Sequence, residues 1–383
     1  MAQQNANANA DLTWGGATNL AATTTDARRS LYLKLFSGEL FKGFQRNTIA
    51  RDLITKRTLK NGRSLQFIFT GRTKSEFHVP GQNIMGNTDG APPVAEVTIE
   101  CDDLLISSAF VYELDETLAH YDLRGEISRK IGYSLAENYD RRIFRAVSNA
   151  ARLQSPVTAT NFEEPGGTQV RVGTNAQASD AYVPASLVNA FYDAAAALDE
   201  KGVSGEGRVA VLSPRQYYEL IQDTSSNALI NRDETGDALQ TGNGIISIAG
   251  IKIYKSMNIP FFGKYGVKYG ETNGPVDPGN KGDFVEVATP AMDASTTPDG
   301  QKTVNEYGAA AEFNNSCGLI FQKEAVGCVE AIGPQVQVTS GDVSVVYQGD
   351  VILGRLAMGA KPLNPAAAVE LFAGTNTKPS AFA

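Results

Sequence analysis

The sequence predicts an α+β fold, and three features of the chain support that prediction. Residues 116–152 carry an apolar side chain at every fourth position and favour one long helix. Residues 185–255 alternate between helical and strand-like segments, and residues 318–372 are rich in strand-like segments. A chain of 383 residues exceeds what one hydrophobic core usually supports, so we expect two domains or one elaborated domain.

The N-terminal segment, residues 1–48, has the composition of an arm. Residues 1–27 are rich in Asn, Ala, Thr and Gly and have almost no large apolar side chains. Such a segment cannot bury enough surface to become ordered, so we expect a mobile arm. The apolar side chains of residues 28–48 show near-helical spacing that Gly38 and Gly43 interrupt, which predicts a short, broken helix.

An extended region, residues 52–112, follows. Asn61-Gly62 is the strongest short hairpin signal in it, because both central residues of a type I′ turn need a positive φ. The segments SLQFIFT (64–70) and VAEVTIEC (94–101) have the composition of strands. Two such strands predict a long protruding ribbon, and because a two-stranded ribbon is marginal in water, it needs a surface to lie on.

The long helix predicted at residues 116–152 has an unusual apolar pattern. Because a helix has 3.6 residues per turn, a strict spacing of four drifts by about 40° per step, and the stripe winds around the axis. We therefore predict a spine helix that meets different surfaces along its length. The stripe consists of Leu123, Ile127, Ile131, Leu135, Tyr139, Ile143 and Val147.

The second half of the chain mixes helices, strands and insertions. Stretches rich in Gly, Pro or Thr, at 154–183, 263–282 and 289–305, predict connecting loops or insertions. The last strands are expected to rejoin the region of the spine helix. The predicted elements are a helix at 185–200, a strand at 208–212, a helix capped by Ser213-Pro214, a hairpin around Gly250, and strands at 318–323, 336–340, 343–347 and 366–372.

The residues that carry catalysis or bind metals are sparse. Cys101, Cys317 and Cys328 form an odd number without a CxxC pair, which argues against a disulfide framework or a structural zinc site. The two histidines, His78 and His120, have no ligand partners at metal-like spacing. No glycine-rich stretch completes a phosphate-loop motif. We therefore predict neither an enzyme nor a cofactor, and without a signal peptide or membrane segment we expect a protein that is soluble and intracellular when it is made.

A basic segment stands out in a chain whose formal charge is -8. Residues 46–78 hold eight cations against two acids, a local charge of +6 that leaves 14 excess negative charges elsewhere. An RNA-recognition strand would need an aromatic signature that this segment lacks. A solvated strand edge and a basic arm for an acidic protein partner both remain open. The candidate contact residues are Lys56, Arg57, Lys60, Arg63, Phe67, Phe69, Arg72 and Lys74.

A second basic group lies in the spine helix. Arg141, Arg142 and Arg145 follow each other within two helical turns. They are candidates for a non-specific contact with nucleic acid, or for pairing with acids of neighbouring domains.

Several long segments spread over roughly residues 30–372 carry a resemblance to a known family. They are LYLKLFSGELFKGF, SLQFIFTGRTKSEFHVPGQN, YELDETLAHYDLRGEISRKIGYSLAENYD, SPRQYYELI, IAGIKIYKSMNIP, EAVGCVEAI and YQGDVILGRLAMGAKPLNPAAAVELF. In this order they resemble the major capsid proteins of short-tailed, T-seven-type bacteriophages. The resemblance implies the Hong Kong 97-type fold. The implied parts are an N-terminal arm (1–48), an extended E-loop ribbon with the first peripheral strands (49–115), the spine helix and its connection (116–184), an axial domain (185–325), and returning peripheral strands with the tail (326–383).

The resemblance also implies a function and partners. Copies of the chain would form hexamers and pentamers of an icosahedral shell, the virion head, around double-stranded DNA. A scaffolding protein, a portal protein and decoration proteins are the further partners it implies, and no membrane is involved. An encapsulin-like nanocompartment shell is the alternative within the same fold, and a nucleic-acid-binding protein is a third hypothesis.

Overall fold

The computed structural model describes most of the chain between residues 48 and 374. The predicted arm up to residue 47, the insertions at 263–282 and 289–305, and the predicted strand at 343–347 lie outside the described residues. The described ranges are 48–71, 77–81, 93–101, 104–113, 123–157, 164–173, 178–222, 247–256, 258–259, 316–338 and 348–374.

The chain divides into two compact units. The first contains residues 103–139 and 331–358 together with the N-terminal segment, and the second contains 49–102, 140–330 and 359–383. Helix α3, at Leu123–Arg152, contributes residues to both units. It confirms the predicted spine helix and its end at residue 152.

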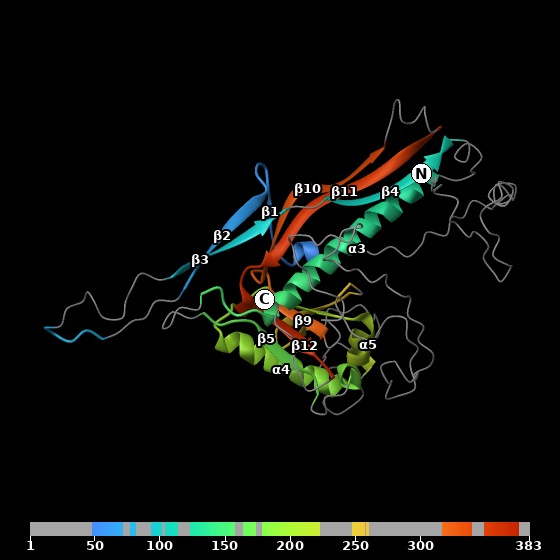
Figure 1. Ribbon diagram of the computed structural model, residues 1–383. Helices are drawn as coiled ribbons and strands as arrows, with labels where there is room; N and C mark the ends of the chain where they lie inside the picture. Colours follow the sequence, from blue (N-terminus) through green and yellow to red (C-terminus); the bar gives the residue numbers. More distant parts are fainter. Residues whose placement is uncertain are drawn as a thin grey trace. The chain divides into compact units, whose positions relative to one another are not determined.

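The first unit packs helix α3 against a sheet. Strands β4 (Leu104–Tyr112) and β11 (Gly349–Pro362) pair antiparallel and lie beside the helix in Figure 1. Gly354 of β11 lets the helix approach closely, because a Cβ atom there would lie 2.3 Å from Cγ2 of Ile131. Strand β11 was not among the strands predicted from the sequence, but it meets the expectation that late strands rejoin the spine helix. The core of this unit consists of Val111, Ile131, Leu135 and Ile352.

A four-stranded sheet has the order β1-β10-β11-β4. Strand β1 (Thr55–Thr58) runs parallel to β10 (Val326–Val338), with Thr55 opposite Gly327. Parallel partners cannot be joined by a tight turn, so this pairing brings together two strands that are far apart in the chain. No local pattern in the extended region, residues 52–112, predicted the pairing of β1 with β10.

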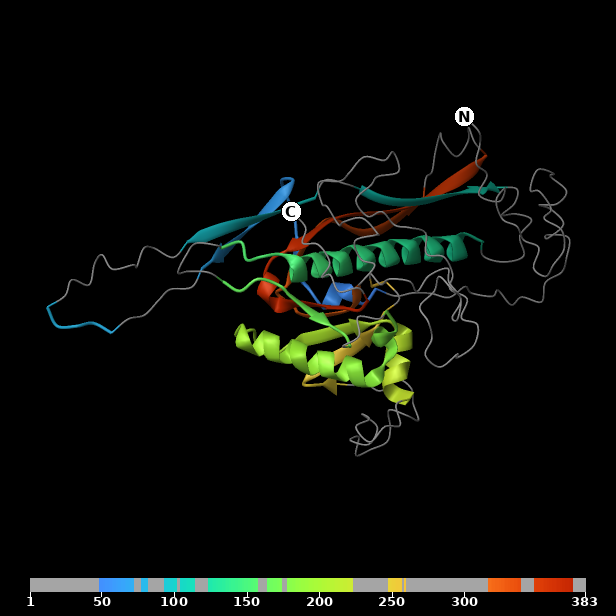
Figure 2. The same ribbon diagram turned by 60° about the horizontal axis from the view of Figure 1, so that its bottom comes forward.

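The second unit is built on a six-stranded mixed sheet. Every residue of β6 and β12 is buried, and so is every residue of the strand between them, β9, except its last, which suits strands with both faces covered. Figures 1 and 2 show α4 on one side of this sheet and the end of α3 on the other. The strands, in sheet order, are β5 (Thr168–Arg171), β12 (Ala368–Phe372), β9 (Ser316–Gln322), β6 (Arg208–Leu212), β8 (Ile251–Lys255) and β7 (Ser247–Ile248).

Strand β5 corrects one expectation from the sequence. The stretch 154–183 was predicted to be only a connection, but it contains β5 and a 3-10 helix, η2 (Ala178–Tyr182). Among the described strands, β5 has β12 as its single partner and lies at the edge of the sheet. A four-residue edge strand has too little periodicity to be recognised from its own residues. Two further 3-10 helices are η1 (Ala50–Asp52) and η5 (Pro365–Ala367).

The helices of the second unit follow their sequence signals closely. Helix α4 (Pro184–Glu200) buries one stripe of side chains on the sheet, as expected for an amphipathic helix. Helix α5 (Pro214–Gln222) begins with the predicted cap at Ser213. Its hydroxyl accepts a bond from the Gln216 backbone N–H at 3.4 Å, and the Gln216 side chain accepts from the Ser213 N–H at 3.1 Å. This reciprocal pair of bonds is a capping box. The two helices predicted in this part of the chain, α4 and α5, are both confirmed.

The predicted hairpin around Gly250 is also confirmed. Strands β7 and β8 pair antiparallel across a two-residue turn, Ala249-Gly250. Both turn residues have a positive φ, 52° and 77°, as a type I′ turn requires.

A separate two-stranded ribbon consists of β2 (Ser64–Thr70) and β3 (Val94–Glu100), and we call these two strands the ribbon. The strands pair antiparallel, which confirms that part of the sequence prediction. Gly62 has a φ of 92°, so the chain does turn there. The hairpin predicted at Asn61-Gly62 is wrong, because β1 and β2 on either side of it belong to different sheets. A positive φ permits a turn, but strand pairing depends on partners elsewhere.

Candidate functional site

The ribbon has two chemically different faces. On one face its side chains are partly or fully buried, and on the other they are mostly exposed, following the period of two of a strand. Phe67 lies opposite Val97 on the more buried face. This face consists of Leu65, Phe67 and Phe69 from β2, and Ala95, Val97 and Ile99 from β3.

The opposite face of the ribbon exposes large apolar side chains to solvent. Ile68 is 76% exposed and Val94, near the start of β3, is 63% exposed. Phe77 and Val79, beyond the end of β2, are also exposed. A single exposed apolar residue is ordinary, but two on the thin ribbon and two more just beyond it mark a surface that suits a protein contact.

The predicted basic contact residues have only weak partners within the ribbon region. Lys56 Nζ lies 3.6 Å from Asp52, and Arg63 lies 3.9 Å from Glu100, both at exposed positions. The Arg57 guanidinium lies 5.4 Å from the centre of the Phe67 ring. Pairs of this kind contribute about 0–1 kcal/mol each to stability, so they restrict these basic side chains only weakly. Lys60 is exposed, Phe69 lies half-buried on the ribbon, and Arg72 and Lys74 lie outside the described residues.

The root of the ribbon is anchored by a carboxylate that the sequence did not single out. Asp140 of α3 is fully buried and accepts bonds from the backbone N–H groups of Ile49 and Ala50 at 3.0 and 3.1 Å. These groups begin η1, so the negative charge also lies at a helix start. The sequence around an acid in the middle of a helix does not indicate that the acid is buried, because its hydrogen-bond partners lie far away in the chain.

A second anchor holds the same segment. The Arg51 guanidinium donates to both carboxylate oxygens of Glu330, at 3.2 and 3.0 Å. Thr55, at the start of β1, donates its backbone N–H and its hydroxyl to the carbonyl oxygen of Lys323. A two-point guanidinium–carboxylate pair fixes the orientation of the two side chains as well as the distance between them. The segment before the ribbon is therefore held in a defined orientation at Arg51.

The candidate basic residues of the spine helix are mostly enclosed. Arg141 and Arg142 are 9% and 8% exposed, and Arg145 is partly buried. Side chains so enclosed offer little surface to DNA. Their burial favours the second of the two roles expected from the sequence, a role in pairing inside the protein.

The described residues contain no cluster of His, Cys, Asp or Glu side chains that could hold a metal ion. All three cysteines are free thiols, and burial together with the charge of Glu370 raises the pKa of Cys317. His78 is exposed, and His120 lies outside the described residues. In the same part of the chain no helix is long and apolar enough to cross a membrane.

A family model described as Gp10A-like major capsid protein matches residues 67–372. The chain belongs to this family of capsid proteins. The major capsid protein of Escherichia phage T7 is 25% identical over 348 residues, which covers 88% of this chain and 90% of that protein. The major capsid protein of Enterobacteria phage T3 is 24% identical over 343 residues, with the same coverage.

Solved structures agree with the family of the capsid protein. The capsid structure of cyanophage P-SCSP1u matches with a TM-score of 0.68 and 30% identity, over 91% of this chain and 95% of that chain. The mature capsid of bacteriophage PhiM1 has a TM-score of 0.61 at 15% identity, and shows the fold alone.

The family and the fold confirm the main predictions from the sequence. The protein is a major capsid protein of the tailed-phage type, and its copies assemble into the icosahedral shell of the virion head. Its family is one of structural proteins, not of enzymes. The functional site is therefore a contact surface between copies, and the ribbon is its leading candidate.

Proposed function

We propose that each capsid subunit lays its ribbon across a neighbouring subunit in the shell. The apolar side chains of the ribbon pack on that neighbour, and its cations pair with the neighbour's acids. The observation that supports this most is the exposure of Ile68 and Val94 on a sheet of only two strands. Such a sheet has no core of its own and gains stability from what it covers.

The charge distribution supports the same contact. The segment 46–78 carries +6 and the remainder of the chain carries 14 excess negative charges. One copy's basic segment and another copy's acidic surface therefore attract each other, and a head-to-tail contact of this kind can close into rings. The two anchors at Asp140 and Glu330 would hold the ribbon at the angle that the neighbour requires.

The test is charge reversal on the ribbon. We expect the variant R63E/R72E to remain folded as a subunit and to lose shell assembly, because both positions would then carry a negative charge and repel the acidic neighbour. The matched control R63K/R72K keeps both charges and should assemble. Electron microscopy and sedimentation measure the yield of shells. Shells of normal yield and size from R63E/R72E would refute the ribbon contact.

We further propose that the shell encloses double-stranded DNA and assembles with a scaffolding protein and a portal, and that decoration proteins bind its outside. The family resemblance to phage capsid proteins supports these partners. Purified particles should then contain DNA that resists added nuclease. Particles that contain a folded enzyme and no DNA would indicate the alternative, a nanocompartment.

The division into arm, ribbon, peripheral domain and axial domain is likewise our proposal. The six-stranded sheet with α4 and α5 would form the body of the axial domain, and α3 with β4 and β11 the peripheral domain. Within it, Arg141 and Arg142 would stabilise the subunit rather than contact DNA, since they are nearly enclosed.

A further inference from the structure

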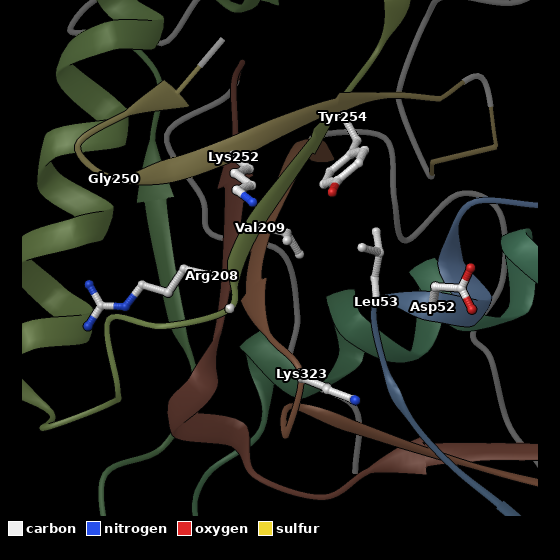
Figure 3. Close-up of a pocket in the computed structure, with 9 residues that line it drawn as sticks. Asp52, Leu53, Arg208, Val209, Gly250, Lys252, Tyr254 and Lys323 are labelled. Carbon is white, nitrogen blue, oxygen red and sulfur yellow. The ribbon is translucent and has the colours of Figure 1, made fainter. Parts of the chain in front are cut away.

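A pocket of roughly 260 Å³ lies against strands β6 and β8 of the six-stranded sheet, beside the segment that leads into the ribbon (Figure 3). Strands β6 and β8 form one wall, and Asp52 and Leu53 form the opposite side. The lining residues are Asp52, Leu53, Gly207, Arg208, Val209, Gly250, Lys252, Tyr254 and Lys323.

The pocket presents cations and a hydroxyl group to one space. Lys252 and Tyr254 are two positions apart on β8, so their side chains leave the same face of the strand, and Figure 3 shows the ammonium and the hydroxyl at the pocket. Lys323 adds a second exposed ammonium from the turn after β9. Arg208 turns away, because its guanidinium pairs with Asp199 at 2.7 Å.

Within the described part of the chain, neither Lys252 nor Lys323 has an ion pair. Asp52, the one acid of the lining, lies 3.6 Å from Lys56 instead. The Lys252 ammonium and the Tyr254 hydroxyl therefore lie on one side of the pocket and the Lys323 ammonium on another, and each is available for an anion. The size of the pocket admits a carboxylate side chain and not a DNA duplex, whose backbone is bound on open surfaces and grooves rather than inside a small pocket.

A complementary surface exists on the same unit. The solvent-facing side of α4 carries Asp193, Asp199 and Glu200, and Tyr192 on that side is 49% exposed. Asp193 and Glu200 are seven residues apart, two turns of helix, so they lie on one line along α4. An exposed tyrosine flanked by charges is a common composition for the centre of a protein contact.

We infer that the pocket at Lys252 and Lys323 receives the acidic face of α4 from a second copy of the chain. This inference rests on the assembly of the capsid protein with itself, and it is independent of the ribbon contact. The two surfaces differ, so each copy can offer its α4 to one neighbour and its pocket to another. A contact of this head-to-tail kind suits subunits that close around a symmetry axis.

The first test is a charge swap. The variants K252E/K323E and D193K/E200K should each reduce the yield of shells at least tenfold, and circular dichroism should show that the subunits remain folded. The combined variant, which reverses both surfaces, should recover most of the yield. If either pair of reversals assembles as well as the wild type, or the combination recovers nothing, the contact is refuted.

The second test identifies the contact directly in assembled wild-type shells. A carbodiimide joins an ammonium and a carboxylate that touch, and shells assembled from a mixture of light and heavy-isotope subunits distinguish bonds between copies. We expect cross-linked peptides that join Lys252 or Lys323 of one copy to α4 of another. Cross-links from these lysines only to other segments, to another protein or within one copy would overturn the inference. If R63E/R72E assembles normally but these results hold, only the ribbon contact fails.

Discussion

Arg152 at the end of α3 and Glu370 in β12 form a two-point ion pair in which both side chains are fully buried. The guanidinium donates to the two carboxylate oxygens at 2.6 and 2.7 Å. Ser148 and Gln169 donate to the same carboxylate at 2.6 and 2.9 Å. The pair therefore joins the end of the spine helix to strand β12 of the six-stranded sheet.

Removal of one partner of this pair should strongly destabilise the subunit. We expect the substitution R152M to lower the free energy of unfolding by about 3–5 kcal/mol, because it leaves a buried carboxylate without its counter-charge. Urea unfolding of the unassembled subunit measures this loss.

Two controls accompany that prediction. The double variant R152M/E370L should recover part of the loss, since no buried charge then remains. The variant K56A removes an exposed pair with Asp52 at 3.6 Å and should cost about 0–1 kcal/mol. An R152M subunit as stable as K56A would contradict the role given to the buried pair.

Gly354 should be intolerant of a side chain. The substitution G354A places a Cβ atom 2.3 Å from Ile131 and 2.9 Å from Leu135, so we expect a loss of about 1–3 kcal/mol from overpacking. Gly333 in β10 is the matched control, because a Cβ atom there meets no atom within 4 Å.

The cause of the Gly354 effect can be separated from a general effect of the substitution. In the double variant G354A/I131A the clash is relieved, so its loss in unfolding free energy should be smaller than the sum of the two single losses. Strict additivity, measured by urea unfolding, would argue against a direct contact between these two positions.

The cap of α5 should contribute measurably to stability. The substitution S213A removes the hydroxyl that accepts from the Gln216 N–H, and we expect a loss of about 1 kcal/mol. S213T keeps the hydroxyl and should stay close to the wild type. Thermal melting of both variants under one condition makes the comparison, and equal melting temperatures would show that the cap is unimportant.

The three thiols should differ in reactivity. Cys317 is buried, and both its burial and the negative charge of Glu370 raise the pKa of its thiol, so little reactive thiolate is present near pH 8. Cys101 is only partly buried and should react first with a thiol reagent. Mass spectrometry should find Cys317 labelled only after unfolding. Rapid labelling of Cys317 in the native subunit, or a fast phase that survives C101S, would contradict this.

Elements with strong local signals could be predicted with accurate bounds. The strand at residues 208–212, the cap at Ser213 and the hairpin at Gly250 each depend on neighbouring residues only. The hairpin predicted at Asn61-Gly62 failed although its local signal was equally strong. A turn needs only a permissive φ, whereas a hairpin also needs the two flanking strands to prefer each other over all other partners.

The contact surface could be predicted in part. The alternation of SLQFIFT and the cations around it marked an arm that lacks a core of its own. The anchors at Asp140 and Glu330 could not be predicted, because nothing in the local sequence distinguishes a buried acid from an exposed one. The burial of Arg141 likewise became visible only once the helix had neighbours.

The family, the α+β class, the spine helix and the strands of the ribbon could be predicted from the sequence, because they follow from periodicity, turn chemistry and long matching segments. Three other features became visible in the folded chain alone: β1 pairs with β10, Glu370 lies buried against Arg152, and Lys252 and Lys323 line the same pocket. Each of these brings together residues far apart in the chain. Their free energies depend on burial and distance, which no local pattern of residues encodes.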